Sequence, residues 1–118
     1  MHELSFAEQI LENVERIARE HAAGKVIRIR LSIGEMLGLN KESLTFCLGA
    51  VTAGTILAGA RIEFEEKRAE VDCPRCGRLP VDPVGVPMCP LCGQRGRFTS
   101  GTELIIEEIE LDEPDAQA

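Results

Sequence analysis

The stretch from Cys73 to Cys92 contains one pattern twice, as Cys73-Pro74-Arg75-Cys76-Gly77 and Cys89-Pro90-Leu91-Cys92-Gly93. These segments hold four of the five cysteines in the chain. A C-x-x-C pair lets two thiolates converge on one ion from a single tight turn, and two such turns supply four soft ligands. Glycine after each pair permits the left-handed conformation that turns backbone N–H groups toward sulfur. The pattern therefore predicts a tetrahedral zinc site.

Three other interpretations of the four cysteines stay open. Two disulfides would require an oxidising compartment, and nothing in the chain suggests export. A thioredoxin-like redox pair should lie at the start of a helix in a βαβ unit, and such a protein carries one C-x-x-C pair rather than two close together. Iron in the same cage, as in a rubredoxin, is the closest rival, because the turns fit both metals. A site saturated by four thiolates has no open coordination position, so we expect a structural role.

The composition limits both the core and the kinds of partner. The chain has 118 residues, of which 44% are hydrophobic, with four Phe and no Trp or Tyr, so its core is aliphatic. A net charge of −7 argues against nucleic acid as the main partner. We find no apolar run long enough for a membrane and no signal-peptide pattern at the start of the chain. We therefore expect a cytoplasmic protein whose thiols stay reduced.

Apolar residues at spacings of three and four predict an amphipathic helix over 6–22, with Ser5 as its N-cap and Gly24 closing it. A second helix is predicted from Asn40 to about residue 52. Its apolar stripe consists of Leu44, Cys47, Leu48 and Val51. Because Cys47 shares this stripe, we expect it to be a small buried hydrophobe.

Three strands are predicted, over 26–33, 61–66 and 103–111. The first alternates strictly, and Arg28, Arg30 and Ser32 should form its solvent face. A helix joins the first two strands, so they should be parallel, and the third should return antiparallel. The fold class is α+β, with two helices on a small three-stranded mixed sheet and an inserted four-cysteine, zinc-ribbon-like lobe.

This order of elements predicts three parts of the chain. Residues 1–70 and 101–112 should form the α+β domain, and 71–100 the inserted metal-binding domain. Residues 113–118 should be a flexible acidic tail.

The first three residues offer a second set of metal ligands. Methionine removal generally needs a small second residue, so His2 predicts that Met1 is retained. The α-amine of Met1, the imidazole of His2 and the amides of His2 and Glu3 can then reach one ion through small chelate rings. Such nitrogen donors suit Ni(II) or Cu(II), and their binding must release protons. Taken alone, an N-terminal histidine more often has no such role.

Taken together, the two metal-binding patterns resemble the hydrogenase-maturation nickel metallochaperones of the HypA/HybF family. The resemblance spans almost the whole chain and rests on short motifs in a fixed order. These are Met1-His2-Glu3-Leu4-Ser5, Gly34-Glu35, Glu42-Ser43-Leu44-x-Phe46, Gly54-Thr55-x-x-x-Gly59-Ala60, the two cysteine pairs and Gly101-x-Glu103-Leu104. The chain departs from the family in the loop Met36-Leu37-Gly38, at Asn40-Lys41 and at Cys47, none of which belongs to either set of ligands.

The resemblance implies two metal sites and a carrier function rather than an enzyme. His2, with the amine of Met1 and the backbone amides of His2 and Glu3, would bind Ni(II) as cargo. The paired cysteines, Cys73, Cys76, Cys89 and Cys92, would hold structural Zn(II). The implied partners are a nickel-binding maturation GTPase, the [NiFe]-hydrogenase large subunit and, in some organisms, urease maturation proteins. We expect no nucleic-acid or membrane partner, and a monomer or weak homodimer.

Two rival functions remain at this stage. One is a zinc ribbon that contacts nucleic acid or another macromolecule, because the lobe carries Arg75, Arg78, Arg95 and Arg97. That lobe has a single aromatic residue for base stacking, Phe98, and the rest of the chain is acidic. The other is a rubredoxin-like electron carrier with iron in the cysteine cage. An enzyme is not expected, because no nucleophile–base arrangement or phosphate-binding loop is present.

Overall fold

The computed structural model describes residues 2–83 and 85–112, with side chains from Glu3 onward. Met1, the side chain of His2 and the predicted acidic tail over 113–118 lie outside this description. The elements follow one another as α1 (His2–Glu20), β1 (Val26–Gly34), the 3-10 turn η1 (Glu35–Leu37), α2 (Lys41–Thr52), β2 (Arg61–Lys67), β3 (Glu70–Cys73), β4 (Gly77–Pro80), β5 (Arg97–Ser100) and β6 (Leu104–Leu111). None of the described helices is both long and apolar enough to cross a membrane.

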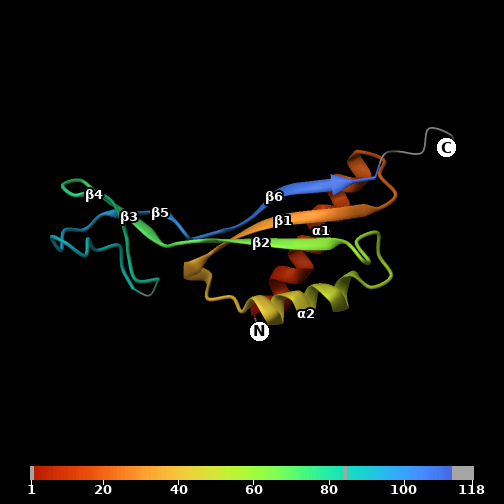
Figure 1. Ribbon diagram of the computed structural model, residues 1–118, viewed down its shortest axis with the longest axis horizontal. Helices are drawn as coiled ribbons and strands as arrows, with labels where there is room; N and C mark the ends of the chain where they lie inside the picture. The colour runs from red at the N-terminus through yellow and green to blue at the C-terminus, as the bar shows by residue number, and fades with distance from the viewer. Residues whose placement is uncertain (1, 84, 113–118) are drawn as a thin grey trace. The chain divides into compact units, whose positions relative to one another are not determined.

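The strands form two sheets of three, in the orders β2-β1-β6 and β4-β3-β5. In the first sheet β1 and β2 run in the same direction and β6 runs against them, as Figure 1 shows. Backbone hydrogen bonds at both ends of the β1–β6 pair agree with this, since Gly34 donates to Glu103 and Asp112 donates to Lys25. The predicted α+β class with a mixed three-stranded sheet is confirmed.

The described residues divide into two compact units, one within 2–31, 39–63 and 106–112 and the other within 32–38, 64–83 and 85–105. In the first unit the apolar stripe of α1 packs on α2. Its buried core is aliphatic, as the composition predicted, and includes Ala7, Ile10, Val14, Ala18, Ile29, Leu31, Leu44, Leu48 and Leu57.

Helix α1 begins at His2, four residues before the predicted start, so Ser5 is not its N-cap. The first turn is held instead from outside the helix, because the Glu3 carboxylate accepts a hydrogen bond from the backbone N–H of Asn40 at 3.0 Å. An acidic side chain in a first turn is also favoured by the positive end of the helix dipole. No local signal in the sequence indicates a partner 37 residues away.

The end of α1 also differs from the expectation that Gly24 closes it. Ala22 adopts a left-handed conformation, with φ of 54°. Its N–H donates to Arg19, and the N–H of Ala23 donates back to Ala18, at 3.0 and 2.9 Å. These two bonds form the closing motif that usually places glycine where Ala22 stands.

Two burial predictions are wrong. Cys47 is half-buried rather than buried, because the buried side of α2 runs through Leu44, Leu48 and Thr52, every fourth residue. Ser32, expected on the solvent face of β1, is fully buried. Ser32 shares its face of the strand with Gly34, because side chains alternate along a strand, and the backbone of 101–103 lies directly against Gly34. A Cβ added to Gly34 would stand 2.3 Å from the Gly101 carbonyl oxygen.

The second unit contains the sheet β4-β3-β5, whose strands were not predicted. Strand β3 is central and pairs antiparallel with both neighbours, with Val71 opposite Leu79 on one side and Phe98 on the other. Only Ala69, Val71 and two of the cysteines are fully buried hydrophobic residues in the stretch 64–105, Val84 excepted. So small an apolar core needs a further source of stability, which a metal site supplies in many small domains.

Candidate metal centre

The first cysteine pair is placed by a β-hairpin. Cys73 is the last residue of β3 and lies opposite Gly77, the first residue of β4, so the turn between them carries Cys76. Gly77 has φ of 82°, which supports the prediction that a glycine must follow the pair. The backbone N–H of Arg75 points back at the Cys73 sulfur, 3.4 Å away.

The second pair sits in a turn of its own. A single bridge joins Met88 to Arg95, and the Cys89 N–H donates to the Gln94 carbonyl at 2.9 Å. Gly93 donates to the Cys89 carbonyl at 2.9 Å and has φ of 76°. The two C-P-x-C-G segments therefore fold into equivalent turns, although only the first lies between regular strands.

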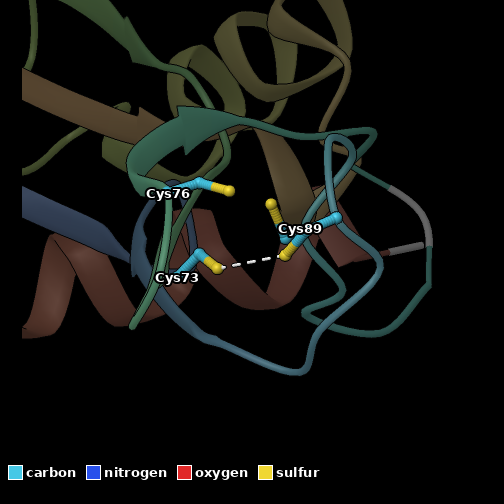
Figure 2. A group of neighbouring side chains, drawn as sticks. Cys73, Cys76 and Cys89 are labelled. Atoms are coloured by element: carbon cyan, nitrogen blue, oxygen red, sulfur yellow. Dashed lines mark hydrogen bonds between the residues drawn. The ribbon is translucent and has the colours of Figure 1, made fainter.

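The four sulfur atoms of Cys73, Cys76, Cys89 and Cys92 all lie within 4.8 Å of one another. Figure 2 shows the labelled sulfurs pointing into one common space, with a dashed line for the 3.6 Å contact between Cys73 and Cys92. Ligands about 2.3 Å from a tetrahedral ion lie about 3.8 Å apart, so this spacing fits a single zinc ion. All five cysteines are free thiols, and the disulfide alternative has no support.

The protonation of these thiols also fits a site that needs a cation. Backbone N–H donation, first from Cys92, lowers the pKa of Cys89 to about 6, because it stabilises the thiolate. The neighbouring sulfurs, first Cys92 and then Cys89, raise the pKa of Cys76 to about 12. One thiol thus loses its proton readily, and its negative charge opposes deprotonation of the neighbouring thiols. A bound divalent ion would allow all four to lose their protons.

The site is closed on one side only. Cys73 and Cys89 are buried, with 2% and 3% of their surface exposed, whereas Cys76 is half-buried and Cys92 is exposed. Four sulfur ligands leave no position for a substrate, so the cluster can hold an ion but cannot offer it a fifth partner without losing a ligand.

The other predicted ligands lie at the start of α1. His2 is the first residue of the helix, and the described part of Glu3 shows its carboxylate turned to the Asn40 N–H. This hydrogen bond holds the pKa of Glu3 below its ordinary value. Asn40 is itself the N-cap of α2, since its side chain accepts from the Ser43 N–H at 2.9 Å. The first turns of both helices are therefore tied together beside His2.

Within residues 3–83 and 85–112, the four cysteines are the only cluster of side chains whose ligand atoms could surround an ion. Cys47 is not part of that cluster. The spacing of the four cysteines was sufficient to predict that they form one metal site. The Glu3–Asn40 contact could not be predicted, because no local pattern in the sequence indicates it.

Comparisons with known proteins agree over nearly the whole chain. The family described as "Hydrogenase/urease nickel incorporation, metallochaperone, hypA" matches residues 1–111. The hydrogenase maturation factor HypA of Archaeoglobus fulgidus is 40% identical over 110 residues, which cover 92% of this chain and 96% of that protein. HypA of Chlorobium limicola is 38% identical over 116 residues, covering 98% and 100%.

Solved structures show the same fold. The solution structure of the Ni metallochaperone HypA from Helicobacter pylori aligns with a TM-score of 0.69 at 19% identity, covering 92% of this chain and 96% of that one. A second HypA solution structure gives a TM-score of 0.71 at 20% identity. The family match and the relatives near 40% identity establish what the motifs suggested: this chain belongs to the HypA family of nickel metallochaperones, a family of metal carriers and not of enzymes.

Proposed function

We propose that this chain binds Ni(II) through Met1, His2 and Glu3 and delivers it in the maturation of [NiFe] hydrogenase, while Cys73, Cys76, Cys89 and Cys92 hold a structural Zn(II). Membership of the HypA family supports the nickel and maturation role. In this proposal residues 71–100 form the zinc domain, and 1–70 with 101–112 carry the nickel. The work takes place in the cytosol, where the thiols stay reduced.

The start of α1 at His2 is the observation that carries the nickel site. The first four N–H groups of a helix have no partner within it, so the amides of His2 and Glu3 are not used by the helix ladder. They can lose their protons to a metal without breaking a helical hydrogen bond. The positive end of the helix dipole favours the negative amide nitrogens that result. With the Met1 amine and the His2 imidazole, they complete four nitrogen donors for a square-planar ion.

The role of Glu3 follows from its hydrogen bond. Its carboxylate accepts from the Asn40 N–H, and this ties the first turn of α1 to the first turn of α2. We assign Glu3 to nickel binding through its backbone amide, with the side chain holding the backbone in place. A chain end held by contacts outside the buried core can still open, which suits an ion that must be released.

The four thiols are assigned to zinc because of their number and spacing. Hard cations prefer oxygen ligands, and the Cys73–Cys92 sulfur distance of 3.6 Å is close to that of a zinc tetrathiolate. The site supplies the stability that the small apolar core of the second unit does not. Elemental analysis of the purified protein distinguishes zinc from iron. The visible absorption spectrum does so as well, because a ferric tetrathiolate is red and its zinc counterpart is colourless.

Nickel titration of protein that begins with Met1 and carries no tag tests the proposal. We expect one zinc per chain and one further Ni(II) that is lost in His2→Ala. The matched control is His21→Ala, because His21 is the other histidine of the chain and lies exposed near the far end of α1. The control should bind nickel like the wild type. Equal nickel affinity in His2→Ala and the wild type would rule out the proposed site.

Delivery is tested with the partners that the family implies. Loaded wild-type protein should activate the [NiFe]-hydrogenase large subunit in the presence of the nickel-binding maturation GTPase, and His2→Ala should not. If His2→Ala supported activation as well as the wild type does, nickel would not reach the enzyme through this site.

A further inference from the structure

A groove of about 460 Å³ lies where the first turn of α1 meets α2. Its walls come from both helices: Glu3, Leu4, Glu42, Ser43, Phe46 and Cys47. All six belong to the first compact unit. The Glu3–Asn40 hydrogen bond joins the two helix starts next to this groove.

The apolar walls of this groove are exposed. Phe46 has 77% of its surface exposed, more than any other large hydrophobic residue among those described, and Leu4 has 48%. Neither side chain belongs to the buried core. The core residues of α2 are Leu44, Leu48 and Thr52, and the first buried residue of α1 is Ala7. Apolar residues that line a hollow and are ringed by polar ones are typical of protein–protein contact sites.

The rim of the groove is acidic. Glu3 and Glu42 stand on its two sides, and the chain as a whole carries a net charge of −7. A second copy would fit poorly, because a two-fold contact places the same patch on both sides and would bring these carboxylates together. A partner that offers Lys or Arg around an apolar side chain complements both the rim and the walls.

We propose that the groove formed by Leu4, Phe46 and Cys47, with Glu3 and Glu42 on its rim, binds a basic amphipathic helix of a partner protein. An apolar side chain of that helix would lie against Phe46, and its basic residues would face the two carboxylates. The role of this contact rests on the proposed function: a partner bound in the groove lies beside His2, where Ni(II) would be transferred.

The test uses a helical peptide of leucine and lysine with leucines at heptad spacing. Two comparison peptides have serine in place of leucine, or glutamate in place of lysine. Binding is measured by fluorescence anisotropy at near-physiological salt, and the rate at which maleimide modifies Cys47 reports on occupancy. Phe46→Ser is the test variant. Leu91→Ser is the matched control, since Leu91 is equally exposed, at 74%, but belongs to the zinc lobe.

We expect the leucine–lysine peptide to bind the wild type and Leu91→Ser alike and to slow the modification of Cys47. Phe46→Ser should weaken binding by at least about tenfold, as for a central interface residue. Equal binding by Phe46→Ser and the wild type, no binding by the wild type, or equal binding of the glutamate peptide would each overturn the proposal. So would self-association of the wild type that Phe46→Ser abolishes, because the occupant would then be a second copy. His2→Ala separates the two hypotheses: it should lose nickel and keep the peptide.

Discussion

Replacing Gly34 by alanine should destabilise the protein, although its φ of −67° suits any residue. A Cβ at this position would lie 2.3 and 2.4 Å from the carbonyl oxygen and carbon of Gly101, and 2.8 Å from the Glu103 nitrogen. All three contacts are with backbone atoms, so no side chain can rotate away. The strand end of β1 or the segment 101–103 would have to move.

The size of the effect follows from the two terms involved. Overpacking of a closely packed site costs about 1–3 kcal/mol. The shift would also stretch two backbone hydrogen bonds, from Gly34 to Glu103 at 2.8 Å and from Met36 to Gly101 at 2.9 Å. Each contributes about 0.5–1.5 kcal/mol. Together we expect a loss of about 2–6 kcal/mol, a large share of the roughly 5–15 kcal/mol that stabilises a typical domain.

Urea unfolding of the zinc-loaded protein, followed by circular dichroism, measures this loss. The matched control is Gly49→Ala in α2, where a new Cβ meets nothing within 4 Å. That change should stabilise the protein by about 0.5–1 kcal/mol, because alanine favours a helix over glycine. The same substitution should thus have opposite signs at the two positions. A loss below about 1 kcal/mol for Gly34→Ala would refute the close approach of β1 and 101–103.

Three further predictions follow from single contacts. Ala22→Gly should raise the free energy of unfolding by about 0.5–1 kcal/mol in the same urea assay, because glycine adopts the left-handed conformation of this helix end without strain; no gain would contradict the assigned helix end. Cys73→Ser should release zinc to a chromogenic chelator while the helical dichroism of α1 and α2 remains, since Cys73 belongs to the second unit only; retained zinc would argue against a four-sulfur site. Glu108→Gln should destabilise most above pH 4.5, and the difference from the wild type should shrink as pH falls, because hydrogen bonds from Arg28 lower the pKa of Glu108 below 4.5 and this stabilisation is lost on protonation. Unfolding curves at several pH values would measure that difference, and one that grew in acid would have the wrong sign.

The sequence was sufficient for the metal cluster and for the fold class, because both depend on short-range patterns. A C-x-x-C pair constrains its own turn, and the spacing of Cys73, Cys76, Cys89 and Cys92 left few other arrangements. The alternation in β1 and the helical period of α1 are local in the same sense. Each C-x-x-C turn, the alternation of β1 and the period of α1 are set by residues that lie close to one another in the chain.

Two of the errors occur where distant segments meet. The start of α1 depends on an Asn40 N–H that lies 37 residues away, and the burial of Ser32 depends on the backbone around Gly101. The burial of Cys47 was predicted wrongly, because an apolar stripe of only four residues is compatible with more than one buried face of the helix. The strands of the lobe carry too few apolar residues to show a period at all. Sequence patterns indicate the local conformation and burial that a residue favours, whereas the structure at these positions depends on the segments that contact them.

The contrast between the two metal sites follows from how each is anchored. The four cysteines come from two turns joined through a sheet, and two of the sulfurs are buried, so opening this cage means disrupting the second unit. The proposed nickel ligands belong to three consecutive residues at a helix start, where the Glu3 carboxylate accepts a hydrogen bond from the Asn40 N–H. This contact lies outside the core of α1, whose first buried residue is Ala7, so the helix start can loosen without disturbing that core. Retention and release of metal place opposite demands on structure. In the proposed assignment, the ion to be retained is held by four cysteines of the second unit, two of them buried, and the ion to be delivered is held by three consecutive residues at a helix start.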